Sequence, residues 1–412
     1  MSDPRPTLLI TSNHTITPLW DGLSKNYDLC IVGPQSPLAQ ELGIEGAFPL
    51  GKYISPDINE TAINVAYKLS AKLFEEQTSA SLASEINEWI SEDVPEQLKA
   101  DKVRQWWPAM VGEHVRQEAS LIEAMGALMN ERKVVGCLVH EDVTPDMRTM
   151  VLYCKTKGAP TIHVPHANCF YMGKDWDIHT ESISDYIAAS GIYAKDFYAR
   201  WGYDTDYIRL TGMPQLDSWY TNNPPSRAEG RRVLGIDDKD FVIIYATSWG
   251  QLTSLRGKFD NEFTRNLKQV LDTAKEMKAI LVVKMHPGEG RGQEEMYVNA
   301  MKEAGVNGCV TRSYNEYVLR AGDVLVAHGP SNICNSSAII NLPSCYFPTA
   351  DFDFPTDGPI RVDGNLQQSI EEARGKSKGY WDAFAKAMND PHDCFENGGA
   401  CERIVEFVQE VC

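Results

Sequence analysis

The chain has 412 residues, too many for one ordinary hydrophobic core, and this length predicts two domains. Hydrophobic residues make up 43% of the chain and charged residues 23%, a balance that excludes a disordered protein. The net charge of -18 disfavours a general affinity for polyanions, so nucleic acid is expected only as an acceptor, bound through a local basic patch.

The N-terminus and the cysteines indicate the compartment. The first residues show no basic segment followed by a long apolar run, and no later stretch is long enough to cross a bilayer. The ten cysteines stand singly, without a CxxC pair, as is typical of reduced thiols in a core. We therefore expect a cytoplasmic protein without a membrane span.

Short apolar runs alternate with amphipathic stretches along the first half of the chain. This alternation predicts an α/β fold, with a parallel sheet covered by helices. The strands expected in this half are 7–12, 27–33, 134–140, 160–166, 185–190 and 207–212. An insert at 57–131 has apolar residues at helical spacing and is predicted to be helical.

A polar segment with adjacent prolines, 221–230, precedes a second series of the same kind. The strands expected there are 240–248, 279–286, 308–312, 323–329 and 343–348. The pattern thus predicts two doubly wound, Rossmann-like domains, at 1–220 and 230–375, that face each other across a cleft. Two helices are expected in 376–412, and their pattern alone does not say which domain they pack on.

Polar residues and glycines are concentrated at the carboxyl ends of the predicted strands, where ligands of such sheets bind. One segment of the second domain passes from a strand through His328 and Gly329 into a helix that begins at Ser331-Asn332. Free N–H groups and the positive dipole end at a helix start favour an anion. The alternative is that Ser331 or Asn332 only caps the helix. Whether His328 touches a ligand or braces the turn stays open.

Lys284 and His286 stand at the end of another strand of the second domain, on the same face by the period of two. A buried lysine needs a partner, and a phosphate would be one. The alternative is that Lys284 reaches out of the sheet while His286 bonds a loop carbonyl.

Two strand ends of the first domain carry ionisable groups, namely His140-Glu141-Asp142 and His166-Ala167-Asn168. A histidine or a carboxylate can deprotonate a hydroxyl acceptor, with His166 as the first candidate and Glu141 as the second. Asp142 or Thr144 could instead cap the next helix. Strand alternation sends His163 and His166 to opposite faces, so a metal site with Cys169 is not expected.

Five segments together resemble the GT-B superfamily of sugar-nucleotide-dependent glycosyltransferases. They are GAPTIHVPHAN (158–168), the stretch from YIAASG to GMPQLD (186–217), VVKMHPGE (282–289), AGDVLVAHGPSNICNSSAIINLPSCYF (321–347) and FENGGACERIVEFV (395–408). The order of these motifs is most similar to the branch containing capsule polysaccharide transferases, CDP-glycerol glycerophosphotransferases and UDP-N-acetylglucosamine 2-epimerases. The resemblance covers about residues 134 to 410.

The resemblance implies an acceptor site in the first domain, a nucleotide donor in the second, and C-terminal helices that cross back onto the first. His166 would activate the acceptor. Arg312 and Ser313 would lie near the nucleobase. The full set of implied donor-binding residues is Ser248, Lys284, His286, Arg312, Ser313, His328, Gly329, Ser331, Asn332 and Ser336.

The implied reaction is direct displacement, in which a UDP- or CDP-linked sugar or a glycerophosphate-like group passes to a glycan or other hydroxyl acceptor, as in polysaccharide biosynthesis. No metal and no cofactor is expected to be required. The chain departs from the family where Ala167 replaces a glycine and where NICNSSAII lacks an acidic residue. The sequence leaves the oligomeric state open.

Three alternatives remain. A 2-epimerase of the same fold needs extra carboxylates, and TSWGQLTSLRG (247–257) does not supply the family's motif. A DNA-modifying glycosyltransferase could use Trp106, Trp107 and the helical insert to hold a large acceptor. A non-catalytic binding relative would keep only the two-domain shell.

Overall fold

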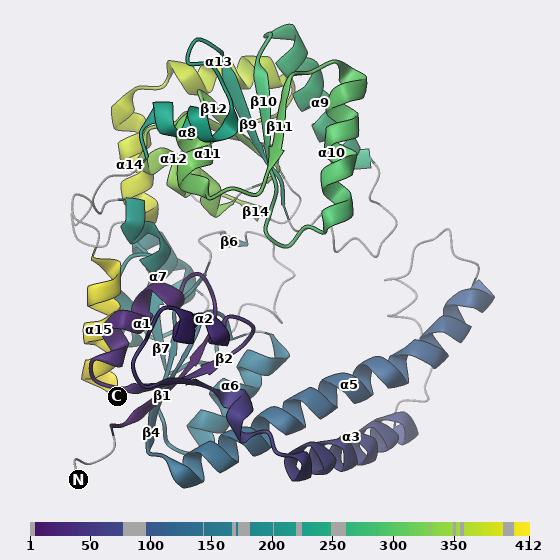
Figure 1. The fold of residues 1–412 in the computed structure, drawn as a ribbon, viewed down its shortest axis with the longest axis vertical. Helices are drawn as coiled ribbons and strands as arrows, with labels where there is room; N and C mark the ends of the chain where they lie inside the picture. The colour runs from purple at the N-terminus through teal and green to yellow at the C-terminus, as the bar shows by residue number, and fades with distance from the viewer. Residues whose placement is uncertain are drawn as a thin grey trace.

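The chain folds into two α/β lobes stacked end to end (Figure 1). The computed structural model describes residues 5–76, 96–142, 144–166, 170–171, 182–200, 202–219, 225–248, 261–329, 331–348, 352–354, 358–389 and 399–412. We call the part up to 219, together with the last helix, the first lobe. The second lobe is the part from 225 to 375.

The first lobe is built on a parallel sheet that has seven strands within the described residues, in the order β3-β2-β1-β4-β5-β7-β8. The strands are β1 (Thr7–Thr11), β2 (Asp28–Val32), β3 (Ala47–Pro49), β4 (Val134–Val139), β5 (Thr161–His163), β7 (Tyr186–Ala189) and β8 (Ile208–Leu210). Every residue of β1 is buried, as expected for a central strand covered on both faces. The order reverses between β1 and β4, so the carboxyl ends of these two strands flank the crevice where such sheets bind ligands.

Helices cover both faces of this sheet. They are η1 (Thr17–Leu19), α1 (Trp20–Ser24), α2 (Ser36–Glu41), η2 (Leu50–Tyr53), α3 (Pro56–Glu76), α5 (Glu96–Glu131), α6 (Pro145–Thr156), α7 (Ile192–Arg200), η3 (Thr205–Tyr207) and η4 (Pro214–Trp219). The insert forms α3 and α5, which pack together and project from the lobe as an arm (Figure 1). Near its C-terminal end α5 buries Met125 and Leu128 against the sheet, which anchors the arm.

The second lobe repeats the design with six strands in the described part of the chain, in the order β11-β10-β9-β12-β13-β15. They are β9 (Val242–Ala246), β10 (Ile280–Lys284), β11 (Gly308–Thr311), β12 (Val324–Ala327), β13 (Ser344–Tyr346) and β15 (Ile360–Arg361). Its helices are α8 (Arg227–Leu234), α9 (Asn261–Glu276), α10 (Arg291–Ala304), α11 (Asn315–Ala321), α12 (Asn332–Ile339) and α13 (Leu366–Gly375). Here the strand order reverses between β9 and β12.

The last two helices connect the lobes. Helix α14 (Lys378–Asn389) contacts α12 of the second lobe and α7 of the first, whereas α15 (Ala400–Val411) packs on α1 and η1 of the first. Asp217 of η4 accepts hydrogen bonds from the backbone N–H groups of Ala400 and Cys401 at the start of α15. A short antiparallel pair, β6 (Phe170–Tyr171) with β14 (Phe352–Asp353), adds a second connection. The expectation placed both closing helices on the first domain, but α14 packs on both lobes.

The predicted α/β class with two facing Rossmann-like lobes is confirmed, and all eleven predicted strands are present in slightly shorter form. The sequence prediction missed β3 and β15, which are too short to show a periodic pattern. Within the described ranges, no helix is both long and apolar enough to span a membrane. The proline segment 220–224 and the side chains of Trp106 and Trp107 lie outside the described residues.

Candidate functional site

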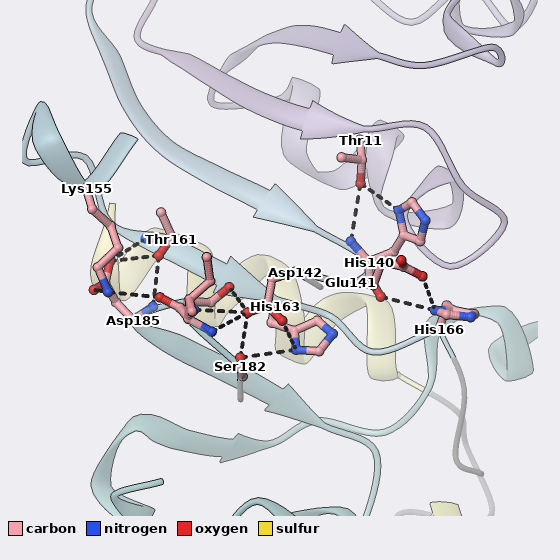
Figure 2. Close-up of polar contacts among 12 residues, drawn as sticks. Thr11, His140, Glu141, Asp142, Lys155, Thr161, His163, His166, Ser182 and Asp185 are labelled. Carbon is pink, nitrogen blue, oxygen red and sulfur yellow. Dashed lines mark hydrogen bonds and ion pairs between the residues drawn. The ribbon is translucent and has the colours of Figure 1, made fainter. Parts of the chain in front are cut away.

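His166 lies just beyond β5, and its carbonyl oxygen contacts Asn332 of the second lobe. Its backbone N–H donates to the carbonyl oxygen of His140 at 3.2 Å, and its ring Nδ1 lies 3.3 Å from the same oxygen. Because a carbonyl oxygen can only accept, the ring contact requires the proton to be on Nδ1. The lone pair of Nε2 is therefore free, and Nε2 points away from His140 (Figure 2).

Glu141 supports this arrangement of His166. One carboxylate oxygen of Glu141 lies 3.7 Å from Nδ1 of His166, and the two side chains are 22% and 40% exposed. A carboxylate on the Nδ1 side stabilises the imidazolium that forms when Nε2 takes a proton. The two catalytic candidates from the sequence are thus neighbours, in the order expected of a base and its supporting carboxylate.

His14 is a third residue at this edge, and the sequence analysis did not single it out. Its ring centroid lies 6.4 Å from that of His166. The side chain is exposed, but desolvation by the protein around it lowers the pKa of His14 to about 4, and the positive charges of His166 and His286 add to this effect. His286 belongs to the second lobe, so His14 lies where the two lobes face each other. Its position after β1 at the strand-order reversal was the available signal.

His140 ends β4 and is buried. Its Nδ1 contacts Oγ1 of Thr11 at 2.9 Å, so the ends of the two central strands are joined (Figure 2). Burial lowers the pKa of His140 to about 3, with further lowering by the positive charges of His166, His163 and His14. His140 is therefore neutral in the folded protein and serves as scaffold for His166.

This buried histidine predicts a pH-dependent stability. The folded pKa lies below the unfolded value of about 6.5, so the unfolded chain binds the extra proton and stability falls as the pH drops below 6.5. Between pH 7 and pH 5 the loss from His140 is about 2 kcal/mol. Urea unfolding at both pH values should show this loss shrink in His140→Gln. An unchanged pH dependence would contradict the assignment, and His114→Gln, an exposed position on α5, is the control.

Asp142 is a buried carboxylate that organises the next segment of the first lobe (Figure 2). Its Oδ2 accepts hydrogen bonds from the hydroxyl of Ser182 at 2.6 Å, the N–H of Ile183 at 2.9 Å, and the N–H and hydroxyl of Ser184 at 3.0 and 2.7 Å. Burial alone would raise the pKa of Asp142, but His163 and these donors outweigh it and lower the pKa.

Of the two alternative caps of α6, neither Asp142 nor Thr144 forms a side-chain cap hydrogen bond. Asp142 is occupied by 182–184, and Thr144, although it occupies the N-cap position, makes no side-chain cap bond. His163 is also buried, with Nδ1 3.8 Å from Oδ1 of Asp142. In the described part of the chain no group of histidines, cysteines and carboxylates is arranged to hold a metal ion. Cys169 and Asn168 lie outside it.

The loop after β10 in the second lobe is held by Glu289, which is not among the site residues predicted from the sequence. Its buried carboxylate accepts the N–H of His286 at 2.8 Å, the hydroxyl of Tyr297 at 2.7 Å and the hydroxyl of Thr247. The N–H of Gly288 donates to Nδ1 of His286 at 3.0 Å. In the neutral ring the proton is then on Nε2, which makes this nitrogen of His286 a donor.

Lys284 and Arg312 flank this loop. Lys284 is buried and its Nζ donates to the carbonyl oxygen of Met285 at 3.0 Å; burial lowers its pKa, and the charge of Arg312 lowers it further. The guanidinium of Arg312 donates to the carbonyl oxygens of Glu289 and Gly290 at 2.8 and 3.1 Å. Both cations thus stabilise the loop that carries His286. Ser313 is tied to Thr311 through its N–H and hydroxyl at 3.0 Å.

The segment that begins α12 lies at the reversal of strand order in the second lobe. Ser331 occupies the N-cap position of α12 but makes no cap hydrogen bond through its side chain. The alternative that Ser331 serves as a side-chain cap is therefore not supported. Ser336 is buried and bonds the carbonyl oxygen of Asn332. His328 contacts the hydroxyl of Tyr245 at 3.0 Å, and burial lowers its pKa to about 4, so it braces the turn. Gly329, which follows β12, is buried. Ser248, which follows β9, is half-buried.

One hydrogen bond joins the two candidate half-sites directly. The side-chain Nδ2 of Asn332, the first residue of α12, donates to the carbonyl oxygen of His166 at 2.8 Å. The start of α12, where helical N–H groups favour an anion, is therefore adjacent to the histidine with the free Nε2. The structure thus brings together one predicted residue of each lobe, Asn332 and His166.

Comparisons with known proteins relate this arrangement to one fold. The sequence model of a family described as CDP-glycerol:poly(glycerophosphate) glycerophosphotransferase matches residues 154–327, which is less than half of the chain. No curated protein matches the sequence. The resemblance expected from the motifs is confirmed over this segment.

Solved structures are similar over nearly the whole chain. UDP-GlcNAc 2-epimerase from Methanocaldococcus jannaschii, in complex with UDP-GlcNAc and UDP, is 13% identical with a TM-score of 0.60, covering 98% of this chain and 99% of that one. The Neisseria meningitidis UDP-GlcNAc 2-epimerase is 12% identical with a TM-score of 0.56, covering 98% and 100%. The wall teichoic acid polymerase TagF is 13% identical with a TM-score of 0.52, covering 99% and 89%. The chain therefore has the GT-B fold.

Proposed function

We propose that this chain, with its GT-B fold and glycerophosphotransferase-like segment, transfers a sugar or a glycerophosphate-like group from a nucleotide-linked donor to a hydroxyl acceptor. The observation that carries the proposal is the Asn332–His166 hydrogen bond, which puts a helix start beside a histidine whose Nε2 can take a proton. A transferase of this kind needs a base for the acceptor and positive groups for the leaving phosphate, and these lie on opposite lobes.

In the proposed reaction, Nε2 of His166 removes the proton of the acceptor hydroxyl. The acceptor oxygen bonds to the transferred group while the bond from that group to the donor's leaving phosphate breaks. Glu141 stabilises the imidazolium through Nδ1. The leaving phosphate, which gains negative charge, is met by N–H groups at the start of α12 and by Nε2 of His286.

Lys284 contributes in a different way from the sequence expectation. Its ammonium is buried and bonded to Met285, so contact with a phosphate requires that bond to be exchanged. In the proposed scheme its charge acts across the loop, together with Arg312, and favours an anion near His286. No step in the scheme needs a metal ion, and we expect EDTA to leave turnover unchanged.

A ligand screen tests the donor assignment. We expect CDP-glycerol or a UDP- or CDP-linked sugar to raise the melting temperature, because a donor at 100 times its Kd adds about 2.7 kcal/mol to stability. Release of nucleotide should then depend on an added hydroxyl acceptor. A flat response to every nucleotide and nucleotide-sugar would overturn the proposal. Interconversion of sugar epimers without acceptor would show an epimerase instead.

A further inference from the structure

The main-chain carbonyl of His166 accepts hydrogen bonds from two side-chain amides outside its own loop. Nδ2 of Asn332 donates at 2.8 Å and Nε2 of Gln215 at 3.3 Å. On the other side, the N–H and the ring of His166 both contact the carbonyl oxygen of His140. His166 is therefore held by His140 through its N–H and ring, and by Asn332 and Gln215 through its carbonyl oxygen.

Both amides belong to parts of the chain that pack with the second lobe. Asn332 begins α12, which lies against the second-lobe sheet. Gln215 lies in η4, whose Leu216 and Trp219 are buried in the second-lobe core cluster with Val242. A change in the angle between the lobes would consequently move Asn332 away from His166, whereas η4 is also held to the first lobe through Asp217 and the start of α15.

The side chain of Gln215 has an unfavourable feature, which its hydrogen bond to His166 explains. Its Oε1 is buried and has no hydrogen-bond partner among the residues that the structure describes, while its Nε2 donates to His166. A buried polar atom without a partner is unfavourable and calls for an explanation. The hydrogen bond from Nε2 to the His166 carbonyl supplies this explanation, because turning the amide to give Oε1 a partner would break that bond.

We propose that Asn332 and Gln215 are positioning residues, which latch the second lobe onto His166 and fix the histidine in its working place when the lobes adopt this arrangement. The inference rests on the proposed function of His166 as the base. It gives the Nδ2 group of Asn332 a contact with the first lobe, whereas the resemblance implied that Asn332 contacts the donor phosphate. The start of α12 thus carries both the proposed phosphate contact, through its backbone, and the contact that places the base, through the Asn332 side chain.

Kinetics of Asn332 variants test the latch. Asn332→Ala should lower kcat about tenfold, the kinetic equivalent of one hydrogen bond of about 1.4 kcal/mol. The donor-induced rise in melting temperature should stay unchanged. Asn332→Asp, which puts a carboxylate against a carbonyl oxygen, should lower kcat at least as much, and Asn332→Gln should restore part of the loss. Asn315→Ala is the control, because Asn315 is exposed at the first position of α11.

A second measurement does not depend on activity. Small-angle X-ray scattering of the Gln215→Ala/Asn332→Ala double variant should show a wider distance distribution than the parent, since the lobes lose these contacts. Unchanged kcat in Asn332→Ala and Asn332→Asp, or loss of the donor-induced melting shift in Asn332→Ala, would overturn the latch. If His166→Ala keeps full turnover, the proposed role of His166 as the base fails instead. The scattering measurement then decides on its own whether the Asn332 and Gln215 contacts hold the lobes together.

Discussion

His166→Ala is expected to lower kcat by about 100- to 10,000-fold at saturating donor and acceptor, the usual contribution of a general base. The reason is the proton on Nδ1, which the contact with the carbonyl oxygen of His140 requires and which leaves Nε2 free to accept. Donor binding should persist, because the groups proposed to hold the phosphate lie on the second lobe. The measurement is acceptor-dependent release of nucleotide, with the donor-induced melting shift followed in parallel.

Two variants accompany this test. His114→Ala removes an exposed histidine on α5, a helix of the projecting arm, and should keep parental turnover. Glu141→Gln should lower kcat less than His166→Ala does, because it removes only the charge that stabilises the imidazolium. Turnover within twofold of the parent in His166→Ala would exclude this histidine as the base.

The α/β architecture was predictable because the central strands are continuous apolar runs. β1 and β9 are buried along their full length, and a parallel sheet covered on both faces leaves that pattern in the sequence. β3 and β15 span three and two residues, too few for any periodicity, and only their pairing with β2 and β13 defines them. Edge strands of this length depend on tertiary contacts.

The residues of the candidate site could be predicted where they directly follow a predicted strand. His166, Glu141 and His286 follow predicted strands, and the parallel sheets bring each to the facing edge of its lobe. What sequence spacing could not give is the pairing between segments. Glu289 reads as one acidic residue among glycines until Thr247 and Tyr297, 42 and 8 residues away, are seen to donate to it.

The predicted caps failed for a related physical reason. Asp142 has the residue type of an N-cap but precedes the N-cap position by two residues, and its buried carboxylate gains more from the hydroxyl and N–H donors of 182–184 than from exposed N–H groups at the start of α6. Ser331 likewise leaves the helix start of α12 without a side-chain cap. The proposed phosphate contact relies on the positive dipole end at this helix start.

Asp142→Ala is expected to lower the free energy of unfolding by about 3–5 kcal/mol, among the largest losses for one substitution in this chain. Its Oδ2 satisfies the N–H groups of Ile183 and Ser184 together with two serine hydroxyls, and all of these would be left facing a buried void. Asp142→Asn keeps an acceptor oxygen and should lose less. Urea unfolding, followed by circular dichroism, measures both.

The matched control for this carboxylate is Asp146→Ala, four residues on, where the side chain is exposed in the first turn of α6 and contributes under about 1 kcal/mol. A loss equal to that of the control would show that 182–184 does not depend on Asp142. Where Asp142→Asn remains folded, turnover becomes informative as well. Glu141 precedes Asp142 directly, so a shift of this strand end moves the carboxylate away from Nδ1 of His166 and should lower kcat without weakening the donor-induced melting shift.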